Sequence, residues 1–499
     1  MSLGVMRTRW LPLLLQGWLL ALFLLHFVAI KIGAVPRWTY TAVDVFSLLV
    51  TVVLLVYWRE WYARVPKIWL CLLVSGVLMA LASCLVNAVD PWVGLSGFRR
   101  YFRFLPFAVL PWLWGVMNVS WQRQSGLLLF LLLLQVPLAL HERWNVPLVI
   151  APGDHVVGTL SSPAFLTITM LCAISVLAAL WLHARISAVL AFGLMSVLFV
   201  PCTLNESKSV LILLPIAALL PWLVSVVQVP VRRGMALFIW MLCAFAVFFP
   251  VYDHFNYGRW GYTLWDFVFE QQRTVSYLSN DFNESLPFVH MSAAEQSQSR
   301  TAIAVDDAAA KPVADEPVVA SSVPAWSGSK QARYQQRIKQ ARHQGLMGAK
   351  KPGKFDSIRL AAVGVGKMPL RGALGAGLGN ASLSRFEFSE GALAKDIEHQ
   401  RPDSTAISLL LWECGFVGVV WVLLLGLYLL WQVLRLVWRP GRYRVAGSAA
   451  AGVLTLVGVS LLYKNLMDSA AIWGLFWYLA GWLVLLANTD APREQGSAA

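Results

Sequence analysis

The sequence predicts an all-α protein, a polytopic membrane bundle of about 12 transmembrane helices with one large loop between spans 9 and 10. Three observations support this fold class. Hydrophobic residues make up 58% of the 499 residues, charged residues only 13%, and the mean hydropathy is +0.63. Soluble globular domains carry about 25% charged residues. Apolar runs long enough to cross a bilayer as helices recur along most of the chain. These features exclude a soluble enzyme, a secreted disulfide scaffold and a nucleic-acid-binding domain.

Twelve apolar segments can be drawn along the chain. In chain order they cover residues 10–30, 41–58, 68–89, 104–120, 126–140, 164–182, 186–204, 210–228, 234–252, 406–432, 446–463 and 469–487. The fifth segment is short and contains Pro137, which predicts a tilt or a kink. We therefore divide the chain into nine spans over 1–252, a loop over 253–405, and three spans with a short tail over 406–499.

The distribution of charge predicts the orientation. Arg7 and Arg9 precede a first apolar segment that is longer than the core of an ordinary signal peptide, so we expect a retained first span. Both termini are expected in the cytoplasm, because this orientation gives the cytoplasmic loops the larger share of Lys and Arg. Residues 253–405 hold 18 Lys/Arg and 16 Asp/Glu, so most of the net charge of +14 lies at the ends of membrane segments. We expect membrane lipids and no nucleic acid as partners.

The loop over 253–405 is exported in this orientation, and its composition changes along its length. Aromatic residues are frequent up to residue 290, which favours a belt at the membrane interface over stacking on sugar rings. Residues 291–356 are rich in Ala, Ser, Gln and Lys. Such a stretch buries too little apolar surface to offset its chain entropy, so we expect disorder there.

The usual signatures of metal, nucleotide and nucleophile sites are absent from the sequence. It has no HExxH, no GxSxG, no Walker lysine and no EF-hand loop, so we expect no metal and no cofactor. Gly375, Gly377 and Gly379 have the wrong spacing for a dinucleotide loop and predict a tight backbone turn. The remaining candidates are charged residues at the exported face.

Arg99, Arg100 and Arg103 form the first group, at the exported start of the fourth apolar segment. Arg99 and Arg103 are four residues apart, so a helix would place both guanidinium groups on one face. Guanidinium groups match phosphate oxygens in bidentate fashion, which makes these two candidate phosphate ligands. Snorkelling toward lipid headgroups is the alternative.

Lys208 is the second candidate. It stands in a polar island of five residues, 205–209, between the seventh and eighth apolar segments. A charge near membrane depth is expensive and normally faces a cavity or a partner. An ordinary turn that contains a Glu206–Lys208 pair is the alternative.

The third group precedes the tenth segment and extends into it. Arg385 and Arg401 are candidates for holding a diphosphate, while His399 or Asp403 would accept a hydroxyl proton as general base. A solvated charged linker is the alternative for each. Glu413 differs, because an acid inside an apolar segment usually has a structural or functional partner. We count it with His399 and Asp403 as a candidate catalytic residue.

Short motifs accompany the arrangement of 12 spans with a large loop before the last few. They are Gly158-Thr159-Leu160 with Ser162-Pro163, the glycine-rich stretch from Pro369 to Asn380, and Asp403-Ser404-Thr405 followed by Trp412-Glu413-Cys414-Gly415-Phe416-Val417-Gly418. With these motifs, the chain resembles the O-antigen ligase and O-antigen polymerase superfamily of bacterial envelope proteins.

The resemblance implies a glycosyltransferase of the bacterial inner membrane that takes a glycan from undecaprenyl diphosphate at the periplasmic face. The acceptor would be a second lipid-linked glycan in a polymerase, or lipid A core in a ligase. Polysaccharide assembly proteins would be further partners. The resemblance implies diphosphate binding by Arg99, Arg103, Lys208 and Arg385, and a base role for His399.

Two other functions stay open at this point. A transporter or flippase for lipid-linked glycan would suit 12 spans, but such folds often consist of two similar halves. Here the large loop follows nine segments and no internal repeat is visible. A non-catalytic assembly subunit would use the loop as a docking arm.

Overall fold

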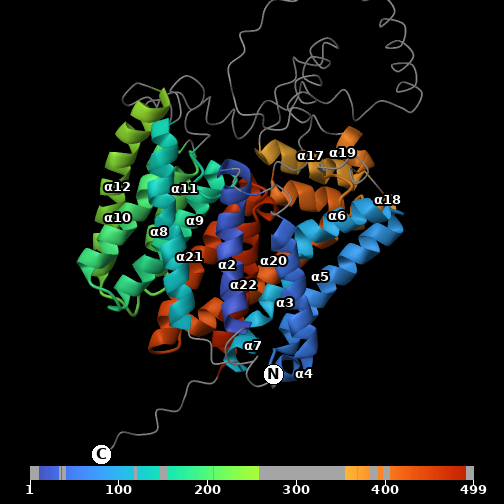
Figure 1. The fold of residues 1–499 in the computed structure, drawn as a ribbon, viewed down its shortest axis with the longest axis horizontal. Coiled ribbons are helices and arrows are strands. Elements are labelled where there is room, and N and C mark those ends of the chain that lie inside the picture. The colour runs from blue at the N-terminus through green and yellow to red at the C-terminus, as the bar shows by residue number, and fades with distance from the viewer. Residues whose placement is uncertain are drawn as a thin grey trace, which may run out of the picture.

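The computed structural model describes most of the apolar segments and part of the loop. The described residues are 11–32, 35, 41–116, 121–145, 156–205, 207–257, 354–367, 369–382, 391–396 and 405–489. Within them every regular element is a helix (Figure 1). The predicted all-α class is therefore confirmed for this part of the chain. The stretch predicted to be disordered, 291–356, lies almost entirely outside the described residues.

Seven helices are long and apolar enough to cross a membrane, which confirms a helical membrane protein among the described residues. They are α5 (Lys67–Val86), most of α8 (Trp121–Asn145), α9 (Pro163–Leu182), most of α12 (Val231–Tyr257), α20 (Ala406–Val437), α21 (Arg442–Tyr463) and α22 (Ala470–Asn488). Shorter apolar helices are α2 (Leu11–His26), α3 (Ala42–Val56), α10 (Ala188–Leu204) and α11 (Val210–Leu223). The number of 12 spans stays a prediction.

The fourth predicted segment, 104–120, differs from the other eleven, each of which contains an apolar helix of at least 14 residues. It begins with a 3-10 turn, Leu105–Ala108, followed by the seven-residue helix α7 (Leu110–Val116). Pro106 and Pro111 lie at the starts of these pieces, and a proline has no N–H to donate to the preceding turn. The expected single long helix is therefore wrong over the described part of this segment.

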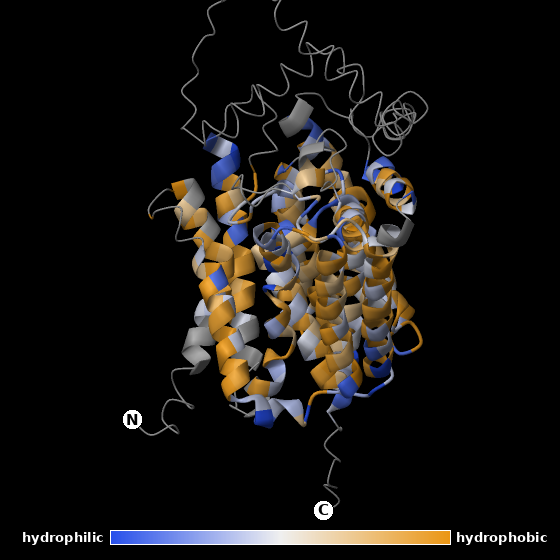
Figure 2. Cartoon of the chain, turned by 90° about the vertical axis from the view of Figure 1, so that its right-hand side faces the viewer, coloured by the Kyte–Doolittle hydropathy of each residue, from blue (hydrophilic) through white to orange (hydrophobic). Residues whose placement is uncertain are grey.

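The hydropathy of the surface matches a membrane orientation. Figure 2 shows apolar residues concentrated along the middle of the helices and hydrophilic residues at the two ends of the bundle. Large apolar side chains within the helices, such as Leu48, Leu78 and Leu427, are at least 59% exposed. In a bilayer these side chains contact lipid.

The last three helices lie inside the bundle and do not form a separate layer. In Figure 1, α20, α21 and α22 lie between the early helices α3 and α5 on one side and α8 to α12 on the other. α20 packs on α5, and α21 packs on α9 and α11. The segments predicted on either side of the loop, 1–252 and 406–499, thus share one core in the described residues.

Four short helices gather at the end of the bundle that carries the loop (Figure 1). They are α6 (Pro91–Phe102), α17 (Lys354–Gly366), α18 (Pro369–Leu374) and α19 (Ala392–Asp396). α17 and α18 pack against the first part of α20. This end therefore brings the α6 arginines, the glycine-rich stretch and Glu413 into one region.

Candidate functional site

α6 presents Arg99 and Arg100 in its last turn and Arg103 at its C-cap, and we call these three residues the α6 arginine cluster. The helix begins after Asp90, whose carboxylate accepts a hydrogen bond from the Trp92 N–H at 2.8 Å. An N-cap of this kind satisfies backbone donors that the first turn leaves unpaired. Because cations are favoured at helix C-termini, the three arginines also complement the dipole of α6.

Arg99 and Arg103 lie on the same carboxylate. The Arg99 Nε donates to Asp44 Oδ2 at 3.0 Å and the Arg103 Nη1 to Asp44 Oδ1 at 3.2 Å. The prediction that both guanidinium groups share one face is therefore confirmed. Asp44 belongs to α3, and it occupies donors that a phosphate group would use.

Arg100 faces the interior of the bundle instead. Its Nε lies 3.4 Å from Asp468 Oδ1, in the 3-10 turn Leu466–Asp468. Its charge also acts on the buried carboxylate of Glu413. The Arg100 side chain is 19% exposed, against 49% for Arg99. The sequence did not identify Arg100 as a site residue. Its position one residue after Arg99 was the available signal, because one helical step of about 100° turns its side chain away from the face that Arg99 and Arg103 share.

Glu413 is completely buried within α20, and the expectation that it has a partner is confirmed. The Ser382 hydroxyl donates a hydrogen bond to Glu413 Oε1. The Tyr101 hydroxyl and the Gly379 N–H face the same carboxylate. Burying a charge is expensive unless polar groups surround it, and these groups with Arg100 offset part of that cost, although Glu413 Oε2 has no hydrogen-bond partner among the described residues.

Tyr101 contributes a phenol hydroxyl to this group. Burial, together with the nearby Glu413 carboxylate, raises the pKa of Tyr101 well above its usual range. The phenol therefore keeps its proton at every physiological pH and can act toward Glu413 only as a donor.

The predicted tight turn in the glycine-rich stretch is confirmed. Gly375, Gly377 and Gly379 have φ angles of +73°, +97° and +79°. The turn packs directly on α20, because the Ala376 N–H donates to the Trp412 carbonyl at 2.7 Å. A Cβ on Gly375 would lie 2.5 Å from the backbone N of Gly415, so only glycine fits this approach.

α20 itself is bent at this contact. Gly415 has φ +63° and ψ −160°, so the helix is interrupted one turn after Trp412. The Ser83 hydroxyl of α5 donates to the carbonyls of Glu413 and Leu374, at 2.8 and 2.6 Å. Two of the motifs quoted for the family resemblance, 369–380 and 412–418, are thus held together by backbone contacts.

The third motif forms a separate polar turn against α8. Gly158 has φ +58°, and its N–H donates to Glu142 Oε2 at 2.7 Å. The Thr159 N–H donates to Gln135 Oε1 at 2.8 Å. Polar side chains within α8 therefore serve the backbone of this turn, which leads into α9.

Lys208 does not join the α6 arginine cluster. It is exposed in the turn between α10 and α11, which lie away from α6 in Figure 1. The buried polar residue of its island is Asn205, whose side chain donates to Thr167 Oγ1 at 2.9 Å. Glu206, its suggested pairing partner, lies outside the described residues.

Several other predicted site residues lie outside the described residues. These are Arg385, His399, Arg401 and Asp403. Their roles stay predictions. Among the residues that the structure describes, no group of three His, Cys, Asp or Glu side chains could hold a metal ion.

As a chemical arrangement, the site is an almost balanced set of charges at the loop end of an apolar bundle. The three cations of the α6 arginine cluster face the carboxylates of Asp44, Asp468 and Glu413. On the Asp44 side Arg99 is half-exposed and Arg103 is largely buried, whereas Glu413 is completely buried. No protein-family model matches this chain, and no curated protein matches it.

Proposed function

We propose that this chain is an integral membrane glycosyltransferase that acts on glycan linked to undecaprenyl diphosphate at the periplasmic face. One observation carries the proposal: the motifs 369–380 and 412–418, quoted for the family resemblance, contact each other around the buried Glu413. Two separate segments, each of which carries a motif of the resemblance, thus meet beside an arginine cluster. The site belongs to the inner membrane, with the loop in the periplasm.

The α6 arginine cluster would receive the diphosphate. A diphosphate carries more negative charge than a carboxylate and offers oxygens to both guanidinium groups, so it competes with Asp44 for Arg99 and Arg103. Arg100 stays on Asp468 and Glu413 and fixes the cluster from the inside. Lys208, Arg385 and Arg401 would contribute further positive charge along the path of the lipid carrier.

The reaction needs a base but no metal or nucleotide. An acceptor hydroxyl attacks the anomeric carbon of the donor sugar, the bond from this carbon to the diphosphate oxygen breaks, and undecaprenyl diphosphate leaves with the electron pair. The hydroxyl proton passes to His399 or Asp403. The arginines stabilise the charge that develops on the leaving group, which is the main task left to the protein.

Glu413 has a positioning role in this proposal. No atom of its side chain reaches solvent, so in this state it holds Ser382 and the glycine turn and does not touch substrate. The charge of Arg100 also acts on the Glu413 carboxylate. Replacing it would therefore displace the turn and the arginine cluster together.

The test uses cells that lack the gene and carry variants of the full chain. Arg99→Gln with Arg103→Gln, and separately Glu413→Gln, should abolish the surface glycan ladder or capped core while lipid-linked precursor accumulates at the periplasmic face. Arg64→Gln is the matched control, because Arg64 is exposed and lies outside the site. Protein level in the membrane is measured in parallel.

The assay separates the proposed reaction from its alternatives. A normal glycan in the double variant would overturn the proposal. Precursor that accumulates only at the cytoplasmic face would indicate a transporter or flippase. A ladder that collapses to single units indicates a polymerase, and uncapped lipid A core with a normal ladder on the carrier indicates a ligase.

A further inference from the structure

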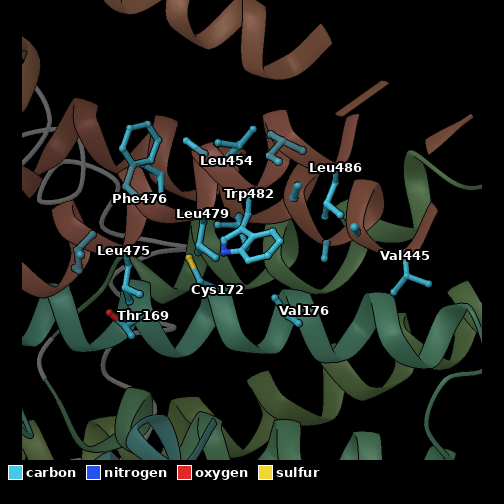
Figure 3. Close-up of a pocket in the computed structure, with 18 of the residues that line it drawn as sticks. Thr169, Cys172, Val176, Val445, Leu454, Leu475, Phe476, Leu479, Trp482 and Leu486 are labelled. Atoms are coloured by element: carbon cyan, nitrogen blue, oxygen red, sulfur yellow. The ribbon is translucent and has the colours of Figure 1, made fainter. Parts of the chain in front are cut away.

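A long apolar groove opens between α9, α21 and α22, away from the candidate site. It has a volume of about 500 Å³. Figure 3 shows Cys172 and Val176 of α9 beneath Leu479 and Trp482 of α22, with their side chains directed into the same space. α21 contributes small residues such as Ala450, which leave the groove open.

The groove covers more than half the thickness of the membrane core. Its lining along α9 extends from Ile168 to Leu180, which corresponds to about 18 Å at the rise of an α-helix, and Arg185 lies in the turn beyond the end of α9. The hydrocarbon core of a bilayer is about 30 Å thick. An elongated apolar slot of this kind, open to the side in a membrane protein, fits a lipid chain.

One end of the groove is cationic. Of the described residues that line the groove, Arg185 alone is charged. It belongs to a group with Arg233 and Arg444, whose charges converge on His183 in the turn after α9. We call Arg185, Arg233 and Arg444 the His183 arginine cluster.

This cluster has no acidic partner within the described part of the chain. No Asp or Glu there lies within ion-pair distance of Arg185, Arg233 or Arg444. The Arg233 guanidinium donates to the Leu182 carbonyl at the end of α9. The Arg444 Nε is buried and has no hydrogen-bond partner there. Three cations near one end of an apolar slot therefore have no counter-charge from the residues that the structure describes.

We propose that the groove binds one anionic phospholipid. An acyl chain would lie along α9, α21 and α22, and the headgroup phosphate would contact Arg185 and Arg444. The lipid would come from the leaflet at the α9–α10 turn, which is the cytoplasmic leaflet in the predicted orientation. The charge of the cluster argues for an acidic lipid over a zwitterionic one, and this proposal does not depend on the proposed function.

The experiment uses the purified full chain, delipidated in detergent and examined by native mass spectrometry. Phosphatidylglycerol and phosphatidylcholine with identical acyl chains are added separately, and inorganic phosphate serves as the free-anion control. We expect one phosphatidylglycerol per chain, bound about tenfold more tightly than phosphatidylcholine, and no retained phosphate. Equal affinity for the two lipids, or displacement of the lipid by millimolar phosphate, would overturn the proposal.

Variants test the two halves of the site separately. Arg185→Gln with Arg444→Gln should remove the preference for phosphatidylglycerol and leave phosphatidylcholine binding unchanged. Ala450→Phe should weaken both lipids by filling the groove; Val176→Phe, at a position 39% exposed in the native chain, does the same without crowding the core. Arg64→Gln is the control. If the arginine variant matches this control, or if the groove instead holds a second copy of the chain, the proposal is wrong.

Discussion

The two arginine clusters differ in what neutralises them. Each member of the α6 arginine cluster lies near a carboxylate of the same chain, provided by Asp44, Asp468 or Glu413. The His183 arginine cluster has no such partner among the described residues. An external anion must therefore compete with a carboxylate of the chain at the α6 arginine cluster, whereas no carboxylate among the described residues competes with it at the His183 arginine cluster. Residue type and local charge do not distinguish these two cases.

The difference has an energetic consequence. Removing one partner of a buried ionic group leaves the other without compensation, so a change in the α6 region should affect stability. In the His183 region, removal of an arginine relieves repulsion between like charges and should affect ligand binding instead. The following predictions test this contrast, beginning with the largest expected effect.

Glu413→Ala removes the buried carboxylate of the α6 region. It removes the acceptor for Ser382 and leaves Arg100 partly uncompensated, so the free energy of unfolding should fall by about 3–5 kcal/mol. Thermal unfolding in detergent, followed by circular dichroism, measures the loss. Arg444→Gln in the other cluster should change it by less than about 0.5 kcal/mol. Equal effects of the two variants would remove the contrast.

Gly375→Ala tests the backbone contact beneath the same cluster. Its positive φ and its Cβ approach to Gly415 predict a loss of about 2–4 kcal/mol in the free energy of unfolding. Gly426→Ala is the matched control, because a Cβ at Gly426 meets nothing within 4 Å and α20 is regular there. The same unfolding measurement applies. Similar stability of the two alanine variants would show that the turn does not require glycine.

The His183 region should make stability depend on pH. Burial, and then the charges of Arg444, Arg185 and Arg233, lower the pKa of His183 to about 4. The unfolded chain takes up this proton near pH 6.5. The stability contributed by neutral His183 is therefore complete above pH 6.5, falls as the pH drops toward 4, and is constant below that.

The expected loss between pH 6.5 and 4 is about 1–2 kcal/mol, smaller than the full shift would give because the side chain is partly exposed. Unfolding temperatures measured across this range provide the test. His183→Gln keeps a side chain that can reach the Ser448 hydroxyl, the partner of His183 at 3.0 Å, and should flatten the pH profile. An unchanged profile in this variant would assign the pH dependence to another group.

Asp44→Asn should give the smallest effect. Asp44 and Arg99 are 25% and 49% exposed, and exposed ion pairs contribute little, so the expected loss in unfolding free energy is below about 1 kcal/mol. High salt should reduce the difference further. The variant should still bind diphosphate if Asp44 only occupies the place of that anion. A loss of several kcal/mol would show that the pair is structural.

Local patterns were sufficient for several features of the α6 region. The four-residue spacing placed Arg99 and Arg103 on one face, the glycines predicted the turn, and the position of Glu413 in an apolar run predicted a partner. Each of these follows from helix geometry or from the energetics of burial. The resemblance and the site roles of His399 and Asp403 stay predictions.

Local sequence patterns could not predict which residues these side chains contact. Asp44 meets Arg99 across 55 residues, and Ser83 meets Glu413 across 330. The inward position of Arg100 was also not predicted. Helical spacing gives the angle between two side chains on one helix, but it does not tell which side of the helix faces the bundle. Pro106 and Pro111 were visible in the fourth segment, yet apolar composition alone predicted a continuous helix there.

The sequence by itself determined that this chain is a helical membrane protein, because hydropathy and helical periodicity act over neighbouring residues. It also determined where charges are spaced along each helix. Only the tertiary structure decided which arginines have a carboxylate partner within the chain and which have none among the described residues. The physical reason is that an ion pair depends on distances between helices, which packing sets and no local pattern records.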